Sequence, residues 1–179
     1  MATFAIDPAH TDVLFSAKHM MVTNVRGTFT DVSGTIDIDE YELTASKADL
    51  IVKAASVDTG FAARDTHLKS DDFFGTERFP DIRVVSTKVD PKGGNDFVVT
   101  ADVTIRDVTR PVDFDVEFLG FYTGMDGARR AGFSARAKVN RKDWDLNWNV
   151  ALEAGGWLVG DQIKLEVDVA VQEAIALAA

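Results

Sequence analysis

The residues of this sequence that are able to do chemistry are few, and their spacing matches no common catalytic arrangement. There is no cysteine, so disulfides, thiolate catalysis and cysteine-based zinc sites are excluded. The three histidines, His10, His19 and His67, form neither an H-x-H nor an H-E-x-x-H metal motif. The sequence also lacks a phosphate-binding loop, a dinucleotide fingerprint and a G-x-S-x-G nucleophile elbow. We therefore expect no metal, no cofactor and no enzymatic activity.

Paired carboxylates are the other feature that acid–base chemistry would use. Asp37 and Asp39 are two residues apart, and so are Asp113 and Asp115. On a β-strand this spacing places both carboxylates on one face, which is usually solvated. A general acid–base couple instead needs a buried group whose pKa is shifted by its surroundings. We interpret these pairs as surface charge.

Apolar and polar residues alternate along most of the chain, which is typical of half-buried β-strands. In 112–118, Val and Phe occupy one face while Asp and Glu occupy the other. The runs 97–105, 133–139 and 163–169 alternate in the same way. Weaker strands are predicted at 11–20, 25–32, 34–39, 46–56 and 80–90.

Turn residues separate the alternating runs, and one segment breaks the alternation. Ser33-Gly34, residues 92–95 and residues 125–127 have the composition of hairpin turns. Residues 58–69 do not alternate; Asp58 or Thr59 can cap a helix, and one helical face carries Phe61, Arg64, Asp65 and Leu68. We predict a short helix there, after the fourth strand, and a second helical turn at 148–155.

Strands that are apolar on one face must bury that face, and an open sheet would leave it exposed together with two edges. Closure into a barrel removes both problems. The sequence therefore predicts an all-β fold, an eight-stranded up-and-down antiparallel β-barrel. A barrel of this size is filled by its own side chains or holds one small ligand. Ala17, Ala101 and Ala135 on the predicted inner rows leave room, although large facing residues can fill it.

Charge and the amino terminus bear on partners and location. Lys and Arg number 19 against 29 Asp and Glu, which gives a net charge of −10. An acidic surface repels phosphate backbones and anionic headgroups, so we expect no nucleic-acid partner. The first residues lack the regions of a signal peptide, and no apolar run is long enough to span a membrane. We expect one domain over 1–179, cytoplasmic and not membrane-spanning.

Several short motifs follow one another along the chain. They are IDPAH (6–10) with VLFSAKH (13–19), RDTHL (64–68) with DDFF (71–74), FPDI (79–82) with VST (85–87), VTIRDVTRPV (103–112), NRKDW (140–144) and VGDQIKL (159–165). In this order they resemble the YceI-like family of bacterial lipid-binding proteins, from Phe4 to about Val171. The resemblance implies a lipocalin-like eight-stranded barrel. It also implies a long apolar ligand inside that barrel, a polyisoprenoid or an isoprenoid quinone.

The resemblance and the inward-facing rows together predict the side chains that contact this ligand. They are Phe15, Ala17, His19, Phe29, Ile36, Leu50, Phe74, Ile82, Val99, Val103, Phe114, Val116, Phe118, Phe133 and Trp148. A lid or mouth is expected from the predicted helix, through Arg64, Asp65, His67 and Leu68.

Two interpretations stay open for most of the polar candidates. His19 either contacts a ligand headgroup or is a neutral, hydrogen-bonded core histidine. Arg64 and Asp65 either meet a headgroup or tie the helix to neighbouring loops by charge-assisted hydrogen bonds. The adjacent Phe73 and Phe74 are expected to point opposite ways, so that only one faces the interior.

The three tryptophans, Trp144, Trp148 and Trp157, are expected to cluster, as a barrel plug or as an aromatic rim around a ligand.

The sequence leaves three classes of function open. The first is a carrier or sequestering protein for a long apolar lipid. The second is an enzyme acting on a lipid-like substrate with a lumen histidine as base. The third is a filled-barrel stress or interaction protein. A homodimer, through an exposed strand edge or through the outward Leu14, Met20 and Met21, is a further expectation.

Overall fold

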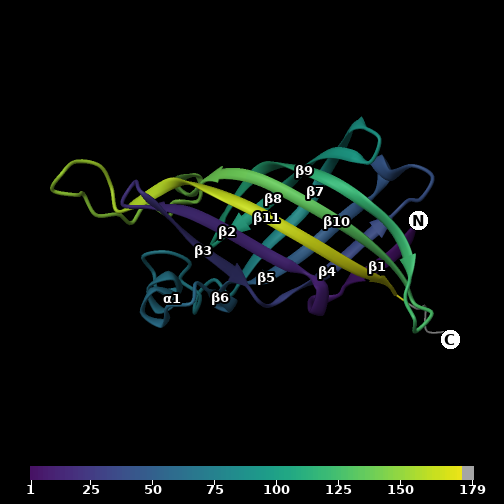
Figure 1. Ribbon diagram of the computed structural model, residues 1–179, viewed down its shortest axis with the longest axis horizontal. Coiled ribbons are helices and arrows are strands. Elements are labelled where there is room, and N and C mark those ends of the chain that lie inside the picture. Colours follow the sequence, from purple (N-terminus) through teal and green to yellow (C-terminus); the bar gives the residue numbers. More distant parts are fainter. Residues whose placement is uncertain (175–179) are drawn as a thin grey trace.

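Almost all regular structure in the described part of the chain, residues 1–174 of the computed structural model, is β-strand (Figure 1). The strands are β1 (Ala2–Ile6), β2 (Asp12–His19), β3 (Thr23–Phe29), β4 (Val32–Ile38), β5 (Lys47–Lys53), β6 (Val57–Asp58), β7 (Asp81–Gly93), β8 (Asp96–Ile105), β9 (Val108–Thr123), β10 (Arg129–Asn140) and β11 (Val159–Glu173). Within the same residues the helical elements are α1 (Ala62–Lys69) and the short 3-10 helices η1 (Pro8–His10), η2 (Leu43–Ala45), η3 (Ala54–Ser56) and η4 (Arg141–Trp144).

The sheet closes on itself. Its order is β1-β4-β5-β7-β8-β9-β10-β11, and β11 pairs back with β1 where Phe4 lies opposite Glu173 and Ile6 opposite Val171. β2 continues the line of β1 beside β11, and β3 continues the line of β4 beside β2. The prediction of an eight-stranded up-and-down antiparallel barrel is therefore confirmed.

The division of residues 2–38 into the four strands β1 to β4 differs from the sequence prediction. The Ser33-Gly34 hairpin is wrong, because both residues lie inside β4, where Gly34 pairs with Leu50. Gly34 has a φ of +134°, and a Cβ there would collide with the backbone of Asp49, so glycine serves a close approach of strands. The chain reverses instead at Met20 and Met21, whose φ values of 50° and 61° are those of a type I′ turn. The strand β1 had no sequence signal strong enough to be predicted.

The helix predicted within 58–69 is confirmed as α1, which follows β5 and the two-residue β6. The second helical turn at 148–155 is wrong. That segment forms a narrow hairpin in which the Leu158 N–H donates to the Val150 carbonyl and Leu152 bonds to Gly156. Gly155 and Gly156 have positive φ, which suits a turn and breaks a helix. No helix within residues 1–174 combines the length and apolar character needed to cross a bilayer.

The alternation fixes which side chains face the barrel interior. Along β9, Val112 and Phe118 are buried and face inward, while the carboxylates between them face out. The outer carboxylates contact other strands: Asp113 accepts from the Thr100 hydroxyl of the neighbouring β8 at 2.6 Å, and Asp115 pairs at 2.7 Å with Lys92 near the end of β7, one strand further away. Such exposed cross-strand pairs add little stability but keep the strand register.

One end of the barrel is packed solid. Phe4 and Val171 are fully buried there, together with Ala131 and Ile38. The ring of Phe121 lies 5.9 Å from that of Phe4. Offset and edge-on contacts of this kind stabilise aromatic pairs beyond their buried area. We call this end the closed end.

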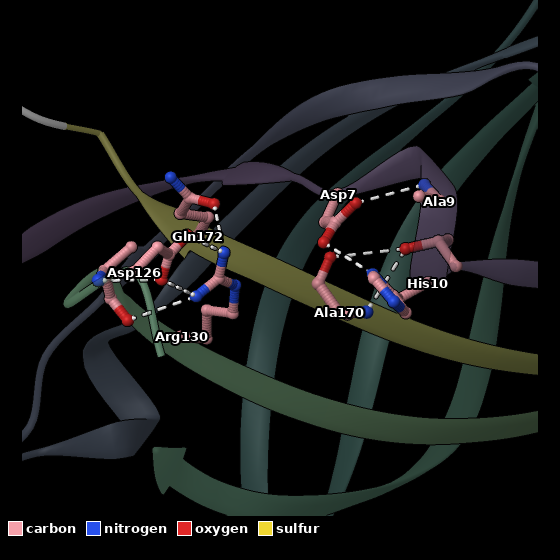
Figure 2. A network of polar contacts seen from close by, with 9 residues as sticks. Asp7, Ala9, His10, Asp126, Arg130, Ala170 and Gln172 are labelled. Carbon is pink, nitrogen blue, oxygen red and sulfur yellow. Dashed lines mark hydrogen bonds and ion pairs between the residues drawn. The ribbon is translucent and has the colours of Figure 1, made fainter. Parts of the chain in front are cut away.

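Charged side chains cover the closed end. The Arg129 guanidinium lies 4.3 Å from the centre of the Phe121 ring and 2.5 Å from Glu40, so it links β10 to the segment after β4. The adjacent Arg130 donates to Asp126 at 2.7 Å and to Gln172 at 3.0 Å (Figure 2). This guanidinium holds the pKa of Asp126 well below its usual range, mainly through the side-chain hydrogen bond. The ion pair between Arg130 and Asp126 therefore stays charged at neutral pH.

The break between β1 and β2 is attached to β11 by hydrogen bonds (Figure 2). The Asp7 N–H donates to the Ala170 carbonyl at 2.9 Å, and the Ala170 N–H donates to the Thr11 hydroxyl at 3.2 Å. The Asp7 carboxylate caps η1 through Ala9 and bonds to His10, which lowers the pKa of Asp7. The wall thus stays continuous although the strand is interrupted.

Replacing Phe4 with Ala tests whether the closed end carries the stability of the barrel. The side chain is fully buried, so we expect the free energy of unfolding to fall by about 3–5 kcal/mol in urea titrations. Tyr41→Ala is the control, since Tyr41 is fully exposed and should cost no more than about 0.5 kcal/mol. Similar losses for both variants would contradict this account of the closed end.

Candidate functional site

The barrel encloses a cavity of about 660 Å³. This volume lies within the usual range of small-molecule sites, roughly 300–1,000 Å³. The wall is almost entirely apolar and receives side chains from strands all around the barrel, from Val13 and Phe15 on β2 to Val167 and Val169 on β11. The expectation of a solidly filled barrel does not fit this cavity.

Every residue predicted to contact a ligand lies on the cavity wall. The set is Phe15, Ala17, His19, Phe29, Ile36, Leu50, Phe74, Ile82, Val99, Val103, Phe114, Val116, Phe118, Phe133 and Trp148. Their contact with a ligand stays a prediction. Ala17, Ala101 and Ala135 also line the cavity, and their small side chains leave space that larger ones would occupy.

The cavity reaches the surface at the end opposite the closed end, beside α1. We call this opening the mouth, and it is bordered by Lys18, His19, Phe61, Arg64, His67 and Trp148. Of the residues predicted to form a lid or mouth, Arg64, His67 and Leu68 line the cavity, whereas Asp65 does not. His19 is half-buried on the wall, at the end of β2.

Arg64 and Asp65 fix the start of α1. One Asp65 carboxylate oxygen accepts from both the N–H and the hydroxyl of Thr59, at 2.9 and 2.6 Å. Arg64 donates to the hydroxyl and the carbonyl of the same threonine, at 2.7 and 2.9 Å. These bonds tie the helix to the loop after β6, as the structural interpretation of the pair expects. Arg64 also lines the cavity.

His67 joins three segments at the mouth. Its Nε2 lies 2.8 Å from an oxygen of Asp72. Since a carboxylate accepts, Nε2 is the donor in this contact. The imidazole is edge-on to the Trp148 ring at 4.5 Å and to the Phe73 ring at 5.1 Å. The contact holds α1, the 70–74 turn and the 146–158 loop together around the opening.

The expectation that only one of Phe73 and Phe74 faces inward is wrong, because both line the cavity. They lie in a turn, where neighbouring side chains need not alternate as they do in a strand. Phe73 contacts Trp148, and Phe74 packs edge-on against Phe29 at 5.7 Å.

The predicted tryptophan cluster is wrong as a single group. Trp144 is buried and donates from its indole to the Val103 carbonyl at 2.9 Å, which seals the barrel wall. Trp148 borders the mouth, and Trp157 is exposed on the 146–158 loop. The two interpretations, plug and rim, thus apply to different tryptophans.

Arg141 is the buried charged side chain among residues 1–174, and it fixes the mouth from beneath. It donates to the carbonyls of Leu146 at 2.6 Å, Trp148 at 2.8 Å and Gly160 at 3.1 Å. Burial lowers the pKa of its guanidinium, and nearby Asp161 partly compensates for this. A planar cation with several donors suits this task, because it satisfies three backbone acceptors at once.

In the sequence Arg141 is visible only as part of the NRKDW motif (140–144), which indicates no role for it. A charge on a short segment between strands carries no signal of burial. Phe61 and Lys18 were also missed as mouth residues, as were Ser46 and Ser86 on the wall near the start of β5. Phe61 and Ser46 lie outside the strands, where alternation does not predict orientation. Ser86 lies at a register shift between β7 and β8, and Lys18 lies next to the last residue of β2, where strict alternation also fails as a guide.

The arrangement suits the binding of an apolar molecule. Among the described residues 1–174, no group of three or more His, Cys, Asp or Glu could hold a metal ion. The polar side chains of the cavity are few, and three of them, His19, Arg64 and His67, lie at the mouth, where they could meet the polar end of a ligand. Away from the mouth the polar side chains on the wall are Thr11, Arg141 and, near the start of β5, Ser46, Lys47 and Ser86, and the rest of the wall is almost entirely apolar.

Known proteins resemble this chain over almost its whole length. The family model of the YceI-like domain matches residues 4–171. A UPF0312 protein of Staphylococcus epidermidis is 38% identical over 167 residues, covering 93% of this chain and 95% of the relative. A UPF0312 protein of Staphylococcus aureus is 36% identical over the same shares.

Solved structures have the same fold. The YceI protein of Campylobacter jejuni has a TM-score of 0.74 at 32% identity, covering 88% of this chain and 90% of that one. BcnA of Burkholderia cenocepacia has a TM-score of 0.77 at 21% identity, with shares of 92% and 98%. A polyisoprenoid-binding domain of Saccharophagus degradans, implicated in plant cell wall breakdown, has a TM-score of 0.72 at 15% identity, with shares of 97% and 99%.

Replacing Arg141 with Met removes the donors while keeping much of the side-chain volume. We expect the free energy of unfolding to fall by about 3–5 kcal/mol, because buried carbonyls lose their partners. Limited proteolysis should then cut within 146–158 at lower protease concentration than in the wild type.

Lys142→Met is the matched control for this variant. Lys142 is half-exposed and pairs with Asp161 at 3.0 Å, so its loss should cost no more than about 1 kcal/mol. If both variants lost the same stability, or if the loop stayed resistant in Arg141→Met, Arg141 would not be what holds the mouth.

Proposed function

This chain belongs to the YceI-like family, and we propose that it binds one long apolar lipid, of polyisoprenoid or isoprenoid-quinone type, inside the barrel. It would carry or sequester that lipid rather than transform it. The single observation that carries the proposal is the cavity of about 660 Å³ with an almost wholly apolar wall. The domain from Saccharophagus degradans that is described as polyisoprenoid-binding is a precedent for such a ligand in this fold.

The driving force is the removal of the chain from water. Burying apolar surface gains roughly 25 cal/mol per Å², so about ten buried CH₂ groups contribute on the order of 8 kcal/mol. Ordering the chain and losing its free translation offset part of this. Branched, unsaturated isoprenoid units suit a wall of Phe, Val and Ile, because such side chains contact irregular apolar shapes without needing polar partners.

The ligand would enter with its apolar end first. The closed end is packed and covered by charged side chains, whereas the mouth carries Lys18, His19, Arg64 and His67. We propose that a headgroup rests among His19, Arg64 and His67, and that Asp65 and Leu68 support them from α1. A cytoplasmic location for this carrier stays a prediction.

Catalysis is the competing function. It requires a nucleophile or base whose chemistry is activated by its neighbours. His67 has a carboxylate partner in Asp72, but its surroundings are aromatic, and among residues 1–174 no hydroxyl or thiol hydrogen-bonds to its imidazole; the Ser70 hydroxyl donates to its backbone carbonyl instead. Binding therefore accounts for the cavity with fewer assumptions.

Filling the cavity tests the proposal. Ala135 lies on the wall in the middle of β10, and Ala135→Phe would place a ring in the lumen. We expect affinity for a fluorescent polyisoprenoid analogue, measured by titration in detergent-free buffer, to fall at least about tenfold. Unfolding free energy should stay within about 1.5 kcal/mol or rise, because the ring occupies empty space.

Ala5→Phe makes the same substitution on the outer face of β1, where Ala5 is exposed. It should bind the analogue as the wild type does. Equal binding by wild type and Ala135→Phe would show that the lumen is not the site. No binding by the wild type to any long isoprenoid would count against the proposed ligand.

A further inference from the structure

Exposed apolar side chains gather beside the mouth. Val22 is 78% exposed and Met21 66% in the turn between β2 and β3, and Trp157 is 56% exposed in the 146–158 loop. Large apolar groups left in water at one place usually mark an interaction surface. We call this surface the tip, and it consists of Met20, Met21, Val22, Val150 and Trp157.

The two segments that form the tip are distant in the sequence but contact each other in the structure. The Met20 N–H donates to the Leu158 carbonyl at 2.8 Å. A Cβ placed on Gly156 would collide with the sulfur of Met21, so the two loops touch there as well. The loop drawn in yellow-green extends well beyond the barrel at the end where the β2–β3 turn lies (Figure 1).

The tip is almost free of charge in a highly charged protein. Charged residues make up 27% of the chain, whose net charge is −10. Within 18–24 and 146–158 the charged residues are Lys18 and Glu153, which cancel. The tip is thus complementary to an electrically neutral, apolar partner rather than to a charged one.

The tip is also continuous with the cavity. Lys18, His19, Trp148 and Leu158 lie on the same two segments and line the lumen. A molecule leaving the mouth therefore passes along the tip before it reaches open water. For an apolar chain, each exposed CH₂ along such a path raises the free energy.

We propose that the tip docks on the surface of a lipid bilayer with neutral, zwitterionic headgroups, so that a lipid passes between bilayer and lumen without crossing water. Met21, Val22 and Trp157 insert among the headgroups and upper acyl chains. This inference rests on the proposed lipid-binding function. Tryptophan suits the interface, since its ring is apolar and its N–H still finds a polar partner there.

A bilayer fits the shape of the tip better than a second copy of the chain does. A stable protein interface buries about 800 Å² on each partner. The tip consists of a two-residue turn and a narrow projecting hairpin, whose contact area is too small for an interface of that size. Apolar side chains at such a point can instead enter a bilayer to a depth of about 5–10 Å.

The test compares paired substitutions at the two ends of the barrel. The tip variant is Met21→Asn with Trp157→Gln; Asn tolerates the positive φ of position 21. The control variant is Met125→Asn with Tyr41→Gln, both fully exposed near the closed end. Each protein is mixed with phosphatidylcholine vesicles and its flotation is measured at low and high salt.

We expect the wild type and the control variant to float with the vesicles to the same extent at both salt concentrations. The tip variant should bind at least about tenfold more weakly. All three should bind the fluorescent polyisoprenoid analogue equally in vesicle-free buffer, because the substitutions lie outside the lumen.

The docking proposal is overturned if the wild type does not float, or if the tip variant floats as the wild type does, even when lumen binding is intact. Tip-dependent flotation without any binding of the analogue supports docking and contradicts the proposed function. Docking is also overturned if light scattering finds a dimer for the wild type and a monomer for the tip variant, and neither protein floats. That result assigns the tip to contact with a second copy of the chain.

Discussion

The pairing of β1 with β11 is the constraint on which the rest of the structure depends. It joins the first strand of the chain to the last, through the register of Phe4 to Ile6 with Val171 to Glu173. Once the sheet is closed, every inward side chain faces a common interior and no wide edge is left exposed. The fully buried Phe4 and Val171 lie at this pairing, so the strands that close the sheet also supply the packed core of the closed end.

Closure makes an interior, and the distribution of side-chain sizes decides that it is hollow. Aromatic rings fill the closed end, while Ala17, Ala101 and Ala135 line the cavity elsewhere. The opening is kept in shape by two polar residues, Arg141 beneath the 146–158 loop and His67 between α1 and that loop. The barrel thus has a closed end packed with apolar side chains and a mouth held in position by the side chains of Arg141 and His67.

Alternation predicts the strands and their inward faces well, because a period of two is imposed by backbone geometry at each residue. For this reason Val99, Phe114 and Phe133 could be assigned to the interior from the sequence. Features that depend on loops could not be predicted. Gly34 resembled a turn glycine but serves close strand packing, and the glycines at 155 and 156 end a hairpin that resembled a helical turn. The burial of Arg141 follows from tertiary folding alone.

The central claim is that the lumen holds a long apolar chain. Its most direct test is a native mass spectrum of the full-length protein, purified from its native host without detergent. The account predicts an added mass that matches a long-chain lipid, remains under gentle conditions and disappears when the protein is denatured, with an isoprenoid recovered by solvent extraction. A spectrum with the mass of the bare chain alone, together with an extract free of lipid, would contradict it.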